Sequence, residues 1–451
     1  MTDRFRWHPE ARLYDSAGAE VLPPAASPPP PSPPHKGEGR RLRPPAGAIL
    51  PDSPQGLATA LGHPAFRIGA PDQPPPDPRD HPILETLTSD STGQPRRIRR
   101  TQGSWIVSFA VNARLGIGPG ARVAVLGRLI HSLALYGAIE GLHLGAEVHL
   151  LDPLRPDRQR QALAARHISL LYATPAQLRL LTDGEGLCPD LRLILTGGSK
   201  LDTTLRARLS TLAPNARIRE FYGAAETSFI TLADETTPES SVGRPYPGVD
   251  LHLDPSGEVW VRSPYLFLGY AAHFPSENIP AGAATGVAPP VRANHVAAEP
   301  VARPSRAEAR RKEGASALNL TTAPARWRDG WLSVGEIGEL KDGYLYLKGR
   351  AGRMVTVADQ NVFPEEIEAF LETLPGVTRA AVLPVPDPKR GQTLIAILQG
   401  DPAEEARLLT RLRQELGPLK APRSLIWRQD WPTLASGKTD LTALEATLWP
   451  A

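Results

Sequence analysis

A chain of 451 residues, 41% hydrophobic and 22% charged, is long enough for two or three domains and has the composition of a soluble globular protein. Of its net charge of +3, residues 22–48 carry +3 and residues 271–325 carry +2, which leaves −2 elsewhere, so no nucleic-acid-binding face is expected. The start of the chain lacks the apolar core of a secretory signal, and no membrane span is predicted. The single cysteine, Cys188, excludes an internal disulfide, fits a reducing cytoplasm and is expected to be a buried, unreactive thiol.

Two segments interrupt this composition. Residues 22–48 combine a polyproline run with Gly and Arg and cannot bury a core, so they are predicted to be disordered. A proline-rich docking ligand is the alternative interpretation of that run. Residues 271–325 are rich in Ala, Pro and Arg and are predicted to be a long disordered insertion.

Between these segments, apolar runs of strand length alternate with helical patterns. The predicted strands are 121–127, 146–152, 168–175, 191–198 and 218–223. The predicted helices are a segment between the first two strands, and 156–166, 176–183 and 201–212. Such alternation predicts an α/β fold with a doubly wound, mainly parallel sheet.

The pattern changes after residue 249. Residues 249–263 and 339–350 each predict a β-hairpin, with turns at Pro255-Ser256-Gly257 and Asp342-Gly343. From about residue 351 the predicted order is helix, two strands, helix and strand. The fold class is therefore a doubly wound sheet with a β-hairpin-rich subdomain and a small C-terminal α+β domain.

The loop LTSDSTGQPRR, residues 87–97, carries the first chemical motif. Loops rich in Thr, Ser and Gly present backbone N–H groups and hydroxyls to phosphate oxygens, and Arg96 adds a cation. By itself such a loop is more often an ordinary turn. The candidate phosphate-binding residues are Thr88, Ser89, Ser91, Thr92, Gly93 and Arg96.

Further motifs follow in a fixed order. They are GRLIHSLALYG (127–137), TGGS (196–199), FYGAAE (221–226), GWLSVGEIGEL (330–340), KGR (348–350), VTVADQNVFPEEIE (355–368) and PTLASGKTDLTAL (432–444). With the loop, this series resembles the adenylate-forming (AMP-binding) superfamily, and within it the acyl-CoA synthetases. The resemblance covers about residues 80–451 without the insertion, so a member shortened at the N-terminus is expected. The expected domains are an N-terminal region (1–80), an AMP-binding large domain (81–350) and a mobile C-terminal domain (351–451).

The resemblance implies an ATP site. Gly197 and Gly198 would line the adenine, Tyr222 of the Tyr222-Gly223 pair would stack on it, and Glu336 and Arg350 would bind the ribose. Glu226 would hold Mg²⁺, since a hard cation prefers carboxylate and phosphate oxygens. Three departures weigh against tight binding or catalysis: Asp90 replaces a glycine, Ala225 replaces a threonine, and Glu336 replaces an aspartate.

The resemblance also implies the reacting groups. His131 would close the acyl pocket, although a lone histidine is more often structural. Lys438 would reach the acyl carboxylate and the α-phosphate, where a positioned ammonium stabilises developing charge. Gly352 lies at the hinge position, and Ala358-Asp359 replaces a Gly-Gly pair that lines the thiol tunnel.

The expected reaction is activation of a carboxylic acid by ATP and Mg²⁺ to an acyl-AMP, followed by transfer of the acyl group to coenzyme A. Loading of an acyl-carrier protein is an alternative. A degenerate member that binds nucleotide or acyl ligand without turnover is another, because of the departures above. The sequence does not name the acid.

Overall fold

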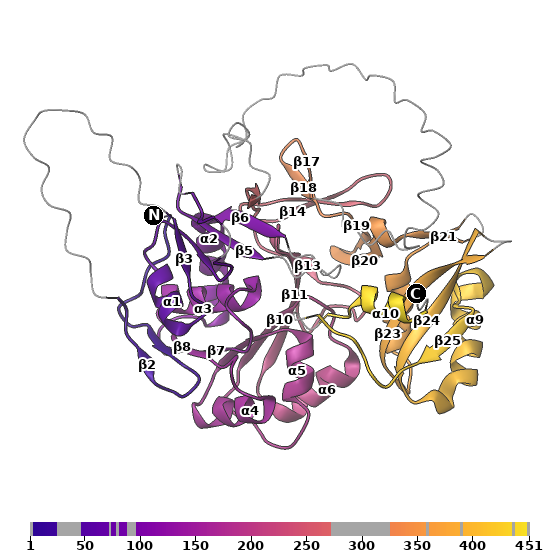
Figure 1. Ribbon diagram of the computed structural model, residues 1–451, viewed down its shortest axis with the longest axis horizontal. Coiled ribbons are helices and arrows are strands. Elements are labelled where there is room, and N and C mark those ends of the chain that lie inside the picture. The colour runs from indigo at the N-terminus through magenta and orange to yellow at the C-terminus, as the bar shows by residue number, and fades with distance from the viewer. Residues whose placement is uncertain are drawn as a thin grey trace, which may run out of the picture.

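A computed structural model describes residues 3–24, 47–71, 74–77, 81–87, 96–271, 325–357, 360–387, 391–434 and 438–448. In Figure 1 the C-terminal elements, drawn in orange to yellow, form a lobe beside the larger body of the chain. The two predicted disordered segments fall mainly on residues 25–46 and 272–324, outside the described residues, and remain predictions.

A nine-stranded sheet forms the centre of the larger body. Its strands, in spatial order, are β13 (Arg244–Pro245), β12 (Ser228–Ala233), β11 (Arg217–Ala224), β10 (Leu193–Gly197), β9 (Leu170–Ala173), β7 (Arg122–Val125), β8 (Glu147–Leu150), β1 (Arg12–Tyr14) and β2 (Glu20–Val21). Neighbours from β11 to β1 are parallel, and the edge pairs are antiparallel. The five predicted strands and the doubly wound parallel sheet are therefore confirmed.

Helices cover both faces of this sheet. Alternate residues of a strand point to opposite faces, so each strand contributes to two cores. Val123 and Val125 of β7 belong to the core that includes residues of α2 (Gln102–Asn112) and α3 (Ser132–Leu144). Ala124 and Leu126 belong to a second core, which is closed by α4 (Pro156–Ala165), α5 (Pro175–Leu181) and α6 (Thr203–Leu212). The helices predicted at 156–166, 176–183 and 201–212 are thus confirmed within one or two residues.

Helix α3 lies unusually close to the sheet. A Cβ on Gly137 would lie 2.6 Å from ring atoms of Tyr172 on β9, and one on Gly141 would lie 2.6 Å from Val148 on β8. Glycines four residues apart share one face of a helix, so this face presents backbone to the strands. The short separation places the first turn of α3 beside the ends of β7 and β9.

The N-terminal residues contribute to two sheets. Besides β1 and β2, a five-stranded sheet contains β16 (Gly269–Tyr270), β6 (Arg97–Thr101), β5 (Ile83–Leu87), β4 (Ala65–Ile68) and β3 (Ala48–Leu50), with α1 (Pro54–Ala60) packed nearby. Strands β5 and β6 are antiparallel neighbours, so residues 88–96 connect two adjacent strand ends. The sequence pattern predicted none of these elements upstream of residue 80.

Two predicted hairpins are present. The first is β14 (Asp250–Leu253) with β15 (Val259–Arg262), which joins β18 (Trp331–Ser333) and β17 (Arg326–Arg328) in a four-stranded sheet. The second is β19 (Glu336–Lys341) with β20 (Tyr344–Arg350). Its turn residues, Asp342 and Gly343, both have positive φ, as a two-residue hairpin turn of type I′ requires.

The C-terminal elements follow the predicted order and have their own apolar cores. They are β21 (Val355–Val357), β22 (Gln360–Val362), α8 (Pro364–Glu372), β23 (Val377–Asp387), β24 (Gly391–Gly400), α9 (Glu405–Lys420), β25 (Ser424–Trp427) and α10 (Leu441–Leu448). The terminal helix α10 was not predicted. It packs Leu441 and Leu444 against the face of the β23–β24 pair opposite to the one that α8 and α9 cover.

Candidate functional site

A cavity of about 180 Å³ opens at the carboxyl ends of the parallel strands. Gly127 and His131 follow β7, Thr174 follows β9, Gly197 ends β10 with Gly198 directly after it, and Ala224 ends β11; all line it. The chain runs from β7 to β8 on one side and then returns to β9 on the other side. In open α/β sheets ligands bind at this switch of direction, outside the carboxyl ends of the strands.

Aromatic rings form the inner wall of the cavity. Trp105, Tyr136, Tyr172, Phe221 and Phe229 all line it. Tyr136 packs edge-on against Trp105 at 5.1 Å between ring centroids and against Phe229 at 5.2 Å. Edge-to-face packing holds large rings in fixed positions. The wall therefore gives the cavity a rigid, largely apolar end.

A buried carboxylate supports this wall from behind. Glu140 on α3 is fully buried and accepts hydrogen bonds from Asn112 Nδ2 at 2.9 Å, from the Tyr136 hydroxyl at 3.0 Å and from the Tyr172 hydroxyl. Burial raises the pKa of Glu140 to about 7, and the three hydrogen bonds oppose this rise. Glu140 thus fixes the orientation of two rings that line the cavity, Tyr136 and Tyr172.

Arg100, on β6, supplies a cation to the same cavity. Its side chain is 1% exposed, and it donates hydrogen bonds to Ser228 Oγ at 2.6 Å and to the carbonyl oxygens of Tyr265 at 3.1 Å and Ala225 at 2.5 Å. Its guanidinium also lies over the Trp105 ring. Burial lowers the pKa of Arg100 to about 10, so the side chain is still charged at neutral pH.

His131 lies where the resemblance placed it, in the cavity, directly before α3. Its Nδ1 is buried and has no hydrogen-bond partner among the described residues. Burial and the nearby Arg128 lower the pKa of His131, so the neutral imidazole predominates at pH 7. A neutral ring can close an apolar pocket without bringing a charge into it.

Lys438 reaches the cavity from the C-terminal lobe. It belongs to the segment between β25 and α10, where Leu434 donates its N–H to the Lys438 carbonyl at 2.9 Å and Thr433 pairs with Thr439. This local pairing fixes the backbone at Lys438. The structure thus brings together His131, Gly197, Gly198, Gly223 and Lys438, which are far apart in the sequence.

A second group of predicted residues gathers between the hairpin and β11. Arg350 Nε donates to Glu336 Oε1 at 3.0 Å. Tyr222 is close enough for Glu336 to act on it: burial, and then the Glu336 carboxylate, raise the pKa of Tyr222 well above its usual range. The Tyr222 hydroxyl is buried and has no partner among the described residues. These three predicted nucleotide contacts therefore form one cluster.

Glu226, the predicted metal ligand, is mostly buried and accepts a hydrogen bond from the Tyr270 hydroxyl at 2.8 Å. The guanidinium of Arg96 lies over the Tyr270 ring, 4.9 Å from Cζ to the ring centroid. Within the described ranges no group of three or more His, Cys, Asp or Glu side chains could hold a metal ion alone. Since Mg²⁺ is commonly held by one or two carboxylates and substrate phosphates, Glu226 fits a Mg²⁺ that arrives with ATP.

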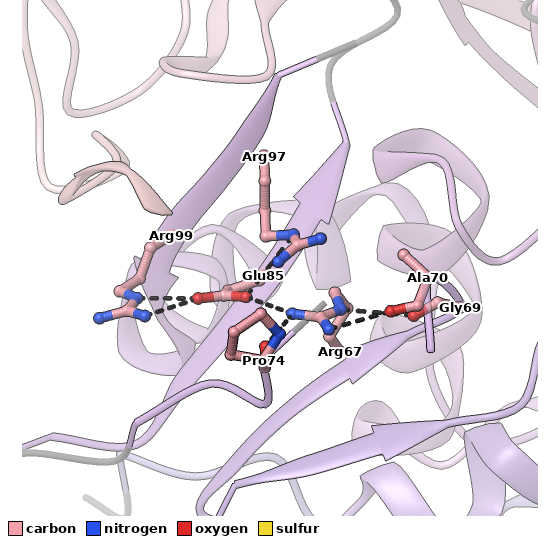
Figure 2. A network of polar contacts seen from close by, with 7 residues as sticks. All are labelled: Arg67, Gly69, Ala70, Pro74, Glu85, Arg97 and Arg99. Carbon is pink, nitrogen blue, oxygen red and sulfur yellow. Dashed lines mark hydrogen bonds and ion pairs between the residues drawn. The ribbon is translucent and has the colours of Figure 1, made fainter. Parts of the chain in front are cut away.

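Four charged side chains clamp the strands that carry the predicted phosphate loop (Figure 2). Glu85 on β5 is 2% exposed and pairs with Arg67 Nη1 at 2.9 Å, Arg99 Nη2 at 2.7 Å and Arg97 Nε at 3.8 Å. Arg67 also donates to the carbonyls of residues 69, 70 and 74. Three guanidiniums thus share this one buried carboxylate.

The predicted hinge lies between two ion pairs. Gly352 is exposed, in the short 3-10 turn Ala351–Arg353 that links β20 to the C-terminal lobe. Before it, Arg350 pairs with Glu336; after it, Arg353 pairs with Glu368 on α8 at 2.7 Å. Gly352 is thus an exposed residue without a side chain, between two arginines that ion pairs hold in place.

Some predicted site residues cannot be placed. Thr88, Ser89, Ser91, Thr92 and Gly93 of the phosphate loop lie outside the described residues, as do Asp90 and the pair at 358–359. Leu87, directly before the loop, lines the cavity, so the loop begins there. Cys188 is buried, and burial raises the pKa of its thiol to about 11, as expected for an unreactive cysteine.

Comparison with known families decides the assignment. Residues 19–271 match the AMP-binding enzyme family, and residues 366–438 match the AMP-binding enzyme C-terminal domain. The chain belongs to the AMP-binding enzyme family. The match begins at residue 19, so the resemblance extends upstream of the start near residue 80 that the motifs indicated. The first motif begins at residue 87, so no motif marks the short strands before it.

Curated relatives of this AMP-binding enzyme are acid–CoA ligases. An uncharacterized acyl–CoA ligase, YhfT, of Bacillus subtilis is 27% identical over 374 residues, which are 80% of this chain and 67% of that protein. The 3-hydroxybenzoate–CoA ligase of an Aromatoleum species is 26% identical over 430 residues, 88% of this chain and 72% of that protein. The family is that of adenylate-forming acyl–CoA ligases.

Solved structures support the fold. The o-succinylbenzoate–CoA synthetase MenE of Bacillus subtilis, in complex with its acyl-adenylate intermediate, matches with a TM-score of 0.61 and 21% identity, covering 80% of this chain and 68% of that one. The α/β fold with a smaller C-terminal domain is thereby confirmed. Among the described residues, no helix combines the length and apolar character needed to cross a bilayer.

Arg100, Trp105 and Glu140 were not predicted as parts of the site. The alternation of β6 holds a signal for Arg100: a period of two places it on the same buried side as Ile98. The sequence RRIRR obscures that signal, because neighbouring cations suggest a solvated surface. Glu140 carries a weaker signal, since a single acid in an otherwise apolar helix face needs polar partners.

Proposed function

We propose that this chain activates a carboxylic acid with ATP to an acyl-AMP and then transfers the acyl group to coenzyme A. The observation that carries the proposal is the position of Lys438. A lysine from the C-terminal lobe lines a cavity at the carboxyl ends of the central sheet, together with His131, Gly197 and Gly198. A cation in this position suits a reaction that builds negative charge at a carboxylate and a phosphorus atom.

The residues divide the work as follows. The aromatic wall holds the acyl group and excludes water, and neutral His131 closes the pocket. Tyr222, Glu336 and Arg350 hold the nucleoside, while the phosphate loop binds the polyphosphate. Glu226 would hold Mg²⁺, which would neutralise charge on the phosphates. Lys438 donates hydrogen bonds to the oxygens on which charge develops in the transition state.

The acid is proposed to be compact. A volume of about 180 Å³ bounded by large rings suits a short-chain or single-ring acid better than a long extended chain. Relatives named for either type exist, namely the 3-hydroxybenzoate–CoA ligase and a putative long chain fatty acid–CoA ligase. Rotation at Gly352 would remove Lys438 and admit the thiol, for which coenzyme A is preferred over an acyl-carrier protein.

ATP–pyrophosphate exchange with a panel of short-chain, long-chain and single-ring acids tests the proposal. Exchange is expected with at least one compact acid, and Lys438→Ala is expected to lower it by ~10²-fold or more, the scale of losing one transition-state contact. Lys341→Ala, at an exposed lysine on β19, is the matched control. A folded wild type with no exchange for any acid would favour the nucleotide-binding, non-catalytic alternative. Transfer from isolated acyl-AMP to coenzyme A or to a carrier protein separates the two acceptors.

A further inference from the structure

Arg100 differs from the other buried arginines in its partners. Arg67, Arg99 and Arg353 each lie within 3.0 Å of a carboxylate oxygen. Around Arg100, no carboxylate lies within ion-pair distance in the described part of the chain. Its partners are neutral: two serine hydroxyls and two carbonyl oxygens. Its Nε, which is also buried, has no described partner at all.

The nearest acid does not neutralise this cation. Glu226 acts on Arg100 from beyond ion-pair distance and already accepts a hydrogen bond from Tyr270. In the proposed reaction Glu226 would also bind Mg²⁺, so its negative charge would pair with the metal ion and not with Arg100. Arg100 then remains a guanidinium without a counter-charge, and an uncompensated buried charge costs several kcal/mol.

The surroundings hold Arg100 in place. Ser228, which accepts a hydrogen bond from Arg100 at 2.6 Å, has a φ of 58°, a left-handed conformation that is strained for a residue with a side chain. Trp105 covers one face of the guanidinium, at 5.5 Å from Cζ to the ring centroid. The chain therefore maintains both an unneutralised cation and local strain at the wall of the cavity.

We propose that Arg100 pairs with a carboxylate of the acid substrate. The proposal rests on the proposed function and adds a recognition residue to it. Arg100 lines the same cavity as Trp105, Tyr136 and Phe229, whose rings keep water away and strengthen a charge pair. A guanidinium is suited to this task, because its planar donors match a carboxylate. The carboxylate is either the reacting one or a second one on a dicarboxylic acid.

Calorimetry with three ligands of one length distinguishes these sources. Hexanoate, adipate and hexanamide are titrated into wild type, Arg100→Gln and Arg100→Lys, with α,β-methylene-ATP present so that no adenylate forms. If Arg100 binds the reacting group, Arg100→Gln weakens hexanoate and adipate alike by ~10-fold or more, and leaves hexanamide unchanged. If it binds a second carboxylate, only adipate weakens. Benzoate, terephthalate and benzamide provide the same comparison for ring acids.

Equal affinities of the acids in wild type and Arg100→Gln, or equal weakening of the amide, would overturn the proposal and leave Arg100 a structural residue. Arg100→Lys keeps the charge without the planar fork and is expected to bind the acids with intermediate affinity. It therefore serves as the test if Arg100→Gln does not fold. Arg262→Gln, at an exposed pair with Asp250, is the control. Failure of the proposed function would instead appear as absent pyrophosphate exchange in the wild type.

Discussion

Glu140 predicts a specific pH dependence of stability. Its carboxyl has a pKa of about 7 in the folded chain, against 4.5 for an ordinary glutamate. Between these values the folded protein holds a proton that the unfolded chain has lost. Stability from this site is therefore complete below pH 4.5 and is lost as the pH rises to about 7. At about 1.4 kcal/mol per pH unit, the loss amounts to ~3 kcal/mol.

The variant Glu140→Gln removes the titration and keeps the shape. Its carbonyl oxygen can accept from Asn112 and Tyr136, and its amide can donate to Tyr172. Thermal unfolding of both proteins is measured from pH 4.5 to 8.5. The melting temperature of the wild type should fall relative to that of the variant up to about pH 7, and the difference should stay constant above that pH. The relative change should be several degrees, since ~3 kcal/mol corresponds to roughly 6–12 °C in a domain of about 200 residues and less in a larger one.

A control is needed because other buried acids also titrate, among them Glu365 and Glu372, whose pKa values burial raises to about 7. They remain in both proteins, so the difference isolates Glu140. Glu147→Gln, at a partly exposed acid on β8, should follow the wild-type curve. Parallel curves for wild type and Glu140→Gln would refute the reasoning, because they would mean that Glu140 has the same pKa in the folded and the unfolded chain.

Three further predictions follow from packing and charge. Glu85→Gln should lower the free energy of unfolding by ~3 kcal/mol or more in denaturant titrations, because a buried carboxylate that contacts three arginines loses its charge, whereas Asp250→Asn at an exposed pair should cost less than ~1 kcal/mol; equal effects would contradict the argument. Gly137→Ala should destabilise by about 1–3 kcal/mol, because its Cβ would meet a Tyr172 ring that Glu140 holds, while Gly103→Ala, with no atom closer than 3.9 Å, should be neutral or stabilising; a harmless Gly137→Ala would show that α3 can shift. Asp90→Gly should tighten ATP binding at least ~5-fold in calorimetry, with Asp90→Asn intermediate, because a carboxylate in a phosphate loop repels the ligand; unchanged affinity would mean that Asp90 points away from it.

The central sheet was predictable because its signals are local. Each strand from β7 to β10 lies in a short, mostly apolar run. The segments between the strands have helical patterns with capping residues at their starts, such as Thr174 before α5 and Asp202 before α6. The N-terminal strands were not predictable in this way. Strand β1 has three residues and pairs with β8, more than 130 residues later, so nothing local marks it.

The site was predictable where a motif carries its chemistry in adjacent residues. Lys438, Gly197 and Tyr222 were found by such motifs. Arg100 and Glu140 were not, because their importance depends on burial and on partners from other elements. A charged residue on a strand face or helix looks the same in the sequence whether it meets water or a closed cavity.

The position of Gly352 separates the residues proposed to bind the nucleoside from the lysine proposed to complete adenylation. Tyr222, Glu336 and Arg350 all precede it, and Lys438 follows it. In the proposed cycle, a turn of the C-terminal lobe exchanges Lys438 for the thiol while the ribose contacts persist. The reactive intermediate would therefore stay bound during the changeover, so hydrolysis competes with transfer only through opening of the cavity and not through release of the acyl-AMP.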